Sequence, residues 1–158
     1  MTNPSGFFFA SLNERKFSMS YIYLNDLTSD VAFEAHGKSL EELLVTAAKA
    51  MLNIMYDLSR VEPMTSVSIS VNGEDAENLV HRWLSEILFL FEVENMLFCE
   101  FRNLKILQTS EGMIVDGELW GNIADPELII THVKGVTYHK FSVHQEDEEW
   151  TTTVVVDI

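Results

Sequence analysis

The chain has 158 residues, of which 47% are hydrophobic, a composition typical of a single globular domain. Its 25 acidic residues against 10 Lys and Arg give a formal net charge of −15. That charge repels phosphate, so strong direct binding of nucleic acid is excluded. The single cysteine, Cys99, excludes both a disulfide framework and a Cys-based zinc site, and we expect it to lie in the core.

The N-terminal region differs from the rest of the chain. Periodic patterns begin at Tyr21, so we expect residues 1–18 to be an irregular extension and residues 19–158 to form one domain. The cluster Phe7–Phe9 is too short for a signal peptide, and positive charges follow it rather than precede it. We expect the cluster to dock on the body or on a neighbour. No apolar run approaches the roughly 20 residues of a membrane-spanning helix, so we expect a cytoplasmic protein without a membrane partner.

The first half of the chain predicts two short strands, a helix and a third strand. The strands are Tyr21–Leu24 and Val31–Ala35. Ser39-Leu40-Glu41-Glu42 is a capping box, and the apolar residues after it recur at spacings of three and four over about four turns. Apolar and serine residues alternate over Val67–Val71, which indicates a half-buried strand ending at an Asn-Gly turn.

The second half predicts another helix and then hairpins. The helix begins near Asp75, a favourable N-cap residue, and its apolar stripe extends to Phe91. The remaining apolar runs predict one hairpin, one short piece and a last hairpin: Leu97–Leu107 with Met113–Trp120, then Leu128–Thr131, then Val136–His144 with Trp150–Ile158. Apolar helix stripes must pack on a sheet or on each other. We therefore expect an α+β fold, a two-layer sandwich whose antiparallel or mixed sheet carries two helices on one face.

Few residues of the sequence suggest a catalytic or ligand-binding role. The chain has no Gly-rich phosphate loop, no His-Glu-x-x-His helix and no Gly-x-Ser-x-Gly elbow. His132 and His139 bracket Lys134 in a segment whose simplest interpretation is a loop leading into a strand. Asp30 follows Thr28 between two short strands, where Asp and Thr side chains commonly bond to the local backbone. Spacing alone favours that local role for Asp30.

Asp157 is unusual because it interrupts an apolar strand one residue before Ile158. Two carboxyl groups as close as the Asp157 side chain and the α-carboxylate of Ile158 repel each other. A hard cation such as Mg²⁺ or Ca²⁺, or a lysine, would relieve that repulsion. The alternative is a frayed chain end with both groups in water, and spacing alone favours it.

Five collinear segments nevertheless resemble the archease family of small proteins. The resemblance covers about residues 20–158, and Val133–His139 is close to the family's Lys-Ala-Val-Thr-Tyr-His signature. Many members have His where this chain has Leu27, which excludes a His ligand there but leaves the aspartates in place. The fold implied is a strand-helix-strand-strand module with inserted elements. The other segments that carry the resemblance are Asp26–Phe33, Ala35–Leu43, Glu77–Phe101 and Val155–Ile158.

The resemblance implies an accessory protein rather than an enzyme. Archeases assist the RtcB-type RNA ligase in tRNA splicing by promoting GTP-dependent guanylylation of the ligase, so that it turns over repeatedly. The partner would be the ligase, and it is the ligase that would bind GTP. The resemblance implies a divalent metal, which could be Ca, Mg or Mn, with Asp30, Asp157 and Ile158 as its ligands. It also implies that Lys134 corresponds to the lysine of the family signature. Residues expected close to this site without being ligands are Thr28, His132 and His139.

Two other functions stay open on the sequence. A metal-dependent hydrolase could use the same Asp30 and Asp157 site, with His132 or His139 as its base. A general chaperone-like module could instead serve several nucleic-acid enzymes.

Overall fold

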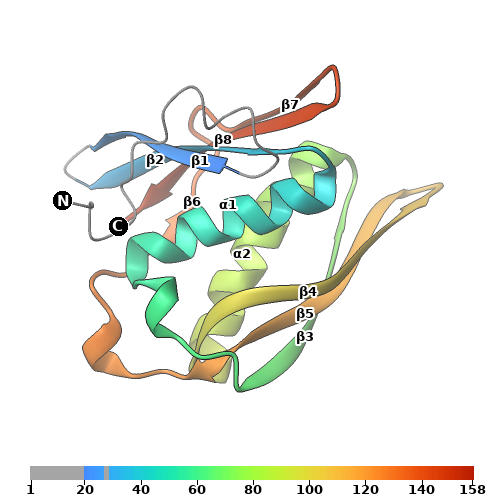
Figure 1. Cartoon of the computed structure of the whole chain (residues 1–158). Helices are drawn as coiled ribbons and strands as arrows, with labels where there is room; N and C mark the ends of the chain where they lie inside the picture. Colours follow the sequence, from blue (N-terminus) through green and yellow to red (C-terminus); the bar gives the residue numbers. More distant parts are fainter. Residues whose placement is uncertain (1–19, 27–28) are drawn as a thin grey trace.

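The computed structural model describes residues 20–26 and 29–158. The expected extension at residues 1–18, Leu27 and Thr28 lie outside the described residues. Over the described ranges, eight strands form two antiparallel sheets, and two α-helices lie between the sheets (Figure 1). The α+β sandwich predicted from the sequence is confirmed, and the strands prove to be shared between two sheets.

The first sheet holds five strands and contains both ends of the predicted domain. Its order is β1-β2-β8-β6, and β7 also pairs with β8. Every pairing in this sheet is antiparallel. The longest register is that of β2 with β8, which pairs the two strands from Asp30↔Asp157 to Gly37↔Trp150. The strands are β1 (Ser20–Asp26), β2 (Asp30–Gly37), β6 (Gly135–Val136), β7 (Ser142–Glu146) and β8 (Glu149–Asp157).

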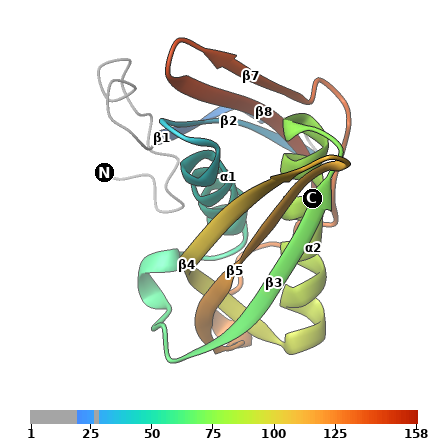
Figure 2. The same cartoon turned by 90° about the vertical axis from the view of Figure 1, so that its right-hand side faces the viewer.

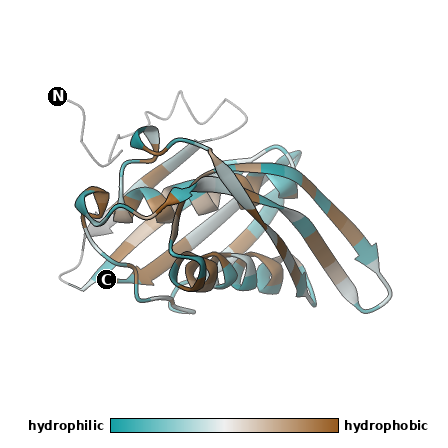
Figure 3. Ribbon diagram, turned by 90° about the horizontal axis from the view of Figure 1, so that it is seen from below, coloured by the Kyte–Doolittle hydropathy of each residue, from teal (hydrophilic) through white to brown (hydrophobic). Residues whose placement is uncertain are grey.

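The second sheet has three long strands in the order β3-β5-β4 (Figure 2). They are β3 (Thr65–Gly73), β4 (Met96–Thr109) and β5 (Gly112–Ile123). The predicted hairpin of β4 and β5 is confirmed, and its turn lies at Ser110-Glu111. Brown and teal alternate along the strands in Figure 3, as expected where one face of a sheet is buried.

Both predicted helices are confirmed with their caps. Helix α1 (Leu40–Met55) begins at Ser39, whose side chain accepts from the Glu42 N–H, and the Glu42 carboxylate accepts from the Lys38 N–H. Helix α2 (Ala76–Glu94) begins at Asp75 and ends at Asn95, which adopts a left-handed φ of 52°. No helix in the part of the chain that the structure describes is long and apolar enough to span a membrane.

The division into two sheets follows from how α1 is buried. Twelve of the sixteen residues of α1 are buried, and the buried face extends over most of the circumference. The four half-buried residues share one side of the helix: Glu41, Glu42, Val45 and Lys49. A helix of that kind needs cover on more than one side. β2 covers one side with Phe33, which is fully buried, and α2 and β4 cover the others. Cys99 is buried at the start of β4, as expected, and burial raises the pKa of its thiol to about 11.

Two short predictions need correction. The piece Leu128–Thr131 is not a strand: a 3-10 helix over Pro126–Leu128 precedes a single bridge between Ile129 and Tyr56. The run Val136–His144 is not one strand either, because it is interrupted between β6 and β7. Register with β8 changes across the interruption, and a continuous strand could not satisfy both pairings.

A single tyrosine joins the end of α1 to the second sheet. Tyr56 is fully buried, and its hydroxyl donates to the Phe98 carbonyl and accepts from the Phe98 N–H, both at 2.8 Å. Phe98 lies in β4, an edge strand, so no other strand of the described residues pairs with its backbone groups on that side. The Tyr56 hydroxyl takes the place of that strand.

Tyr56→Phe removes only one oxygen atom, but it should lower the stability of the protein substantially. It leaves a buried N–H and a buried C=O unpaired, and we expect a loss of about 2–4 kcal/mol in the free energy of unfolding, measured by urea denaturation. Tyr23→Phe is the matched control, because its buried hydroxyl hydrogen-bonds to the Ala50 carbonyl within α1 and to Tyr21, and neither partner lies in the second sheet. The control should lose about 1 kcal/mol. Equal losses in the two variants would contradict the bridging role.

Candidate functional site

The two predicted aspartates meet at one end of the first sheet. The antiparallel register of β2 and β8 places Asp30 directly opposite Asp157. Val31 and Phe33 of β2 are buried toward the helices, so Asp30 lies on the other face of the sheet, away from α1 and α2. The two carboxyl groups interact closely enough for Asp157 to raise the pKa of Asp30. Residues separated by most of the chain thus form one carboxyl pair.

Backbone hydrogen bonds hold Asp157 from both sides. The Lys134 N–H donates to the Asp157 carbonyl oxygen at 2.7 Å, and Gly135 of β6 pairs with Asp157. On the β2 side, the Ile158 N–H donates to the Ser29 carbonyl oxygen at 2.9 Å. The last residues of the chain therefore lie between two strands, and the prediction of a frayed end is wrong.

The carboxyl pair is electrostatically unfavourable when both groups are ionised. The hydrogen bond to Asp157 raises the pKa of Asp30, and partial loss of hydration and the negative charge of Asp157 raise it further. His139 acts in the opposite direction and lowers the pKa of Asp30. A positive charge at this place would relieve the repulsion, which is what a divalent cation supplies.

The other predicted residues divide into two groups. His139 has an electrostatic effect on the Asp30 carboxyl group, and the Lys134 backbone N–H donates to the Asp157 carbonyl oxygen. His132 lies elsewhere: its ring meets Phe91 of α2 at a centroid distance of 6.4 Å. Within residues 20–26 and 29–158, no three His, Cys, Asp or Glu side chains are grouped so that they could hold a metal together.

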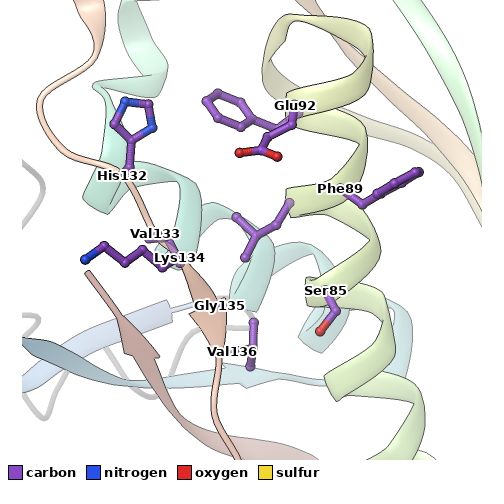
Figure 4. A pocket seen from close by; sticks show the side chains of 10 residues that line it. Ser85, Phe89, Glu92, His132, Val133, Lys134, Gly135 and Val136 are labelled. Atoms are coloured by element: carbon purple, nitrogen blue, oxygen red, sulfur yellow. The ribbon is translucent and has the colours of Figure 1, made fainter.

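A groove of about 370 Å³ runs along the other side of this segment. Figure 4 shows Ser85, Phe89 and Glu92 projecting from α2 on one wall, with residues 132–136 forming the opposite wall. Phe89 is 57% exposed, and the Lys134 side chain points away from α2. The segment 132–136 therefore separates the groove from the carboxyl pair.

The surroundings of His139 were not predicted from the sequence. Residues 137–141 leave the sheet between β6 and β7, and Tyr138 in this excursion stacks on His81 of α2. The one available signal was the position of His81, which precedes Leu84 and Leu88 by three and seven residues on the apolar side of α2. A histidine in that position is commonly a core residue.

Removing one charge of the pair should stabilise the protein at neutral pH. The native state holds a proton on Asp30 more tightly than the unfolded chain does, because the folded-state pKa of Asp30 is raised, so the free energy of unfolding falls as pH rises through the carboxyl range. Without divalent cations, we expect Asp30→Asn to raise the melting temperature at pH 7 in calorimetry. The gain should vanish once the pH lies below the ordinary Asp pKa of about 3.9, where both states are protonated.

Glu62→Gln is the control for that experiment, because Glu62 is an exposed carboxylate away from the pair. It should show no gain at either pH. A gain from Asp30→Asn that persisted unchanged in acid would exclude carboxyl repulsion as its cause.

Comparison with known proteins agrees with this architecture. The model of the Archease protein family matches residues 21–158. A protein archease of Methanopyrus kandleri is 42% identical over 133 residues, covering 83% of this chain and 94% of the relative. One of Archaeoglobus fulgidus is 34% identical over 141 residues, covering 89% of this chain and 100% of the relative.

Two solved structures share the fold. The solution structure of Methanobacterium thermoautotrophicum protein 1598 has a TM-score of 0.78 and 32% identity, covering 87% of this chain and 98% of that one. The crystal structure of a Thermotoga maritima archease, described as a possible chaperone, has a TM-score of 0.58 and 20% identity, covering 85% and 95%. With a family match over nearly the whole described chain and relatives above 30% identity, the protein belongs to the archease family.

Proposed function

We propose that this protein is an accessory factor of an RtcB-type RNA ligase. In this role it promotes GTP-dependent guanylylation of the ligase and so allows many rounds of RNA sealing in tRNA splicing. The acting group is the Asp30–Asp157 pair together with a divalent cation. The observation that carries the proposal is the β2–β8 register, which gathers both carboxyl groups beside the backbone of Lys134.

The donor atoms at the site fit a hard cation. Asp157 raises the pKa of the Asp30 carboxyl group, and a cation bound between the two carboxylates would relieve the same repulsion. The proposed ligands are these two carboxylates and an oxygen of Ile158, an oxygen-only set that suits Ca²⁺, Mg²⁺ and Mn²⁺. When bound, the cation would supply positive charge to a phosphate group. Asp30 and Asp157 would fix its position, and His139 acts electrostatically on Asp30.

The charge of the protein supports action through a partner. A net charge of −15 favours docking on a basic surface such as that of an RNA-binding enzyme, and competes poorly for RNA itself. The Asp30–Asp157 pair lies on the face of the sheet opposite α1 and α2, the two helices of the described residues, and this is the face on which we expect the partner to dock. GTP would therefore meet this site in the ligase rather than in the free protein.

The proposal is tested by multiple-turnover RNA ligation. With cognate ligase, GTP, Mn²⁺ and excess broken RNA, substoichiometric protein should raise ligation from about one turnover per ligase to many. The double variant Asp30→Ala and Asp157→Ala should lose this stimulation at least about tenfold, as expected when a charged group central to a site is removed. Circular dichroism would verify that the variant is folded.

Asp116→Ala is the matched control, because Asp116 is an exposed aspartate on β5 of the other sheet. It should stimulate the ligase fully. Full stimulation by the folded double variant would refute the proposed site. Turnover of a simple phosphoester by the protein alone would favour a hydrolase, and equal binding to several unrelated nucleic-acid enzymes would favour a general chaperone.

Cation binding is tested separately from the ligase. Ca²⁺, Mg²⁺ or Mn²⁺ at ten times its Kd should add about 1.4 kcal/mol to the free energy of unfolding, because it binds only the folded state. Asp157→Asn should abolish this gain in a thermal-shift titration. If the folded Asp157→Asn variant gained as much from each cation as the unaltered protein, the cation would bind elsewhere.

A further inference from the structure

Strand β6 is the shortest strand of the first sheet and lies at the end of the order β1-β2-β8-β6. On the β8 side, the Lys134 N–H donates to the Asp157 carbonyl oxygen at 2.7 Å. The Thr137 N–H donates to the Val155 carbonyl oxygen at 3.0 Å. On the other side of β6, no strand of the described residues pairs with it. A strand with so few partners opens locally at low cost in free energy unless a further contact holds it.

A buried histidine of α2 supplies such a contact. His81 is 8% exposed, and its Nε2–H donates to the Val136 carbonyl oxygen at 3.1 Å. Tyr138 stacks on the imidazole with centroids 3.8 Å apart and planes 8° apart, and Phe141 meets it edge-on at 5.3 Å. Three residues within six positions of the chain thus contact one imidazole ring.

The helix that carries His81 is itself fixed in the core. Val80, directly before it, is fully buried. Trp83 is also fully buried, and its indole N–H donates to the Leu44 carbonyl oxygen of α1 at 2.9 Å. Close-packed contacts of this kind give α2 a position that does not depend on β6. His81 therefore presents a fixed hydrogen-bond donor to Val136.

The position of β6 matters for the candidate site. Gly135 of β6 pairs with Asp157, and the Lys134 N–H is bonded to the Asp157 carbonyl oxygen. Strand β6 is thus one of the two neighbours of Asp157, and β2 is the other. The Lys134 side chain points away from α2 (Figure 4). Movement of β6 away from β8 would break the bond to Asp157 and displace Lys134 with it.

We propose that His81 is a positioning residue for the candidate site: its hydrogen bond to the Val136 carbonyl keeps β6 beside β8, and so keeps the Lys134 N–H bonded to Asp157. The effect on cation binding and on ligase activation rests on the proposed function above, whereas the placement of β6 does not.

Amide hydrogen exchange tests the placement of β6 in the protein alone. His81→Phe keeps a flat ring against Tyr138 but removes the donor, so we expect the protection of the Lys134 and Thr137 amides to fall about tenfold. His81→Gln carries a side-chain N–H that can replace Nε2–H, and it should keep this protection within about threefold. Amides of β2, which lies on the other side of β8, should exchange as before in both variants.

His144→Phe is the matched control, because His144 is an exposed histidine of β7, which also pairs with β8. It should leave the Lys134 and Thr137 amides as protected as they are in the unaltered protein.

Cation binding and ligation then test the consequence for the site. In a thermal-shift titration with Ca²⁺, His81→Phe should raise the Kd about tenfold, as is usual when a group that orients a metal ligand is lost. In the ligation assay, the same variant should lower the maximal stimulation at an unchanged half-maximal concentration, because the docking surface is intact. His81→Gln should restore both values.

The outcomes distinguish the two proposals. Undiminished protection of both amides in folded His81→Phe overturns the positioning role, and so does an equal loss in His81→Gln, because the hydrogen bond would then not be what holds β6. Lost protection in His81→Phe with unchanged Ca²⁺ affinity and full stimulation overturns the role of β6 in the site. If the unaltered protein neither binds Ca²⁺ nor stimulates the ligase, the proposed function falls, and the exchange data alone decide the placement of β6.

Discussion

The pairing of β2 with β8 is the constraint on which the rest of the site depends. Its inner face carries Phe33, Val154 and Val156, which are fully buried against the helices. A slip of one residue would turn these side chains to water and bring polar ones into the core. The buried face therefore fixes the register, and the register places Asp30 opposite Asp157. Hydrophobic packing on one side of the sheet determines the electrostatics on the other.

The features that the sequence predicts well are local ones. Capping residues at Ser39 and Asp75 and the stripes behind them identify both helices, because each cap involves residues only three apart. The alternating serines of β3 and the turn after β4 are equally local. The interruption of the strand after Val136 is not predictable in this way. It depends on pairing with β8 at two registers and on a ring supplied by α2.

The candidate site shows the same difference between local features, which the sequence predicts, and long-range contacts, which it does not. Asp30 and Asp157 are 127 positions apart in numbering, and spacing alone favoured a local role for one and a solvated end for the other. Only the sheet register brings them together, and only the family resemblance indicated it beforehand. A histidine in an apolar helix stripe, such as His81, resembles an ordinary core residue. The ring on which it stacks belongs to a distant segment, so no periodicity predicts the contact.

The interruption at residues 137–141 has a further consequence for how the molecule behaves among its own copies. β6 and β7 form the side of the first sheet farthest from β1, where a regular strand would offer an unpaired row of N–H and C=O groups. Such a row is a template for strand addition by a second molecule. The excursion breaks the row and turns a lysine outward with positive φ, so the edge offers no continuous ladder. Strand addition by a second copy at this side of the sheet would therefore have to begin on β6 or β7 alone, each of which is short.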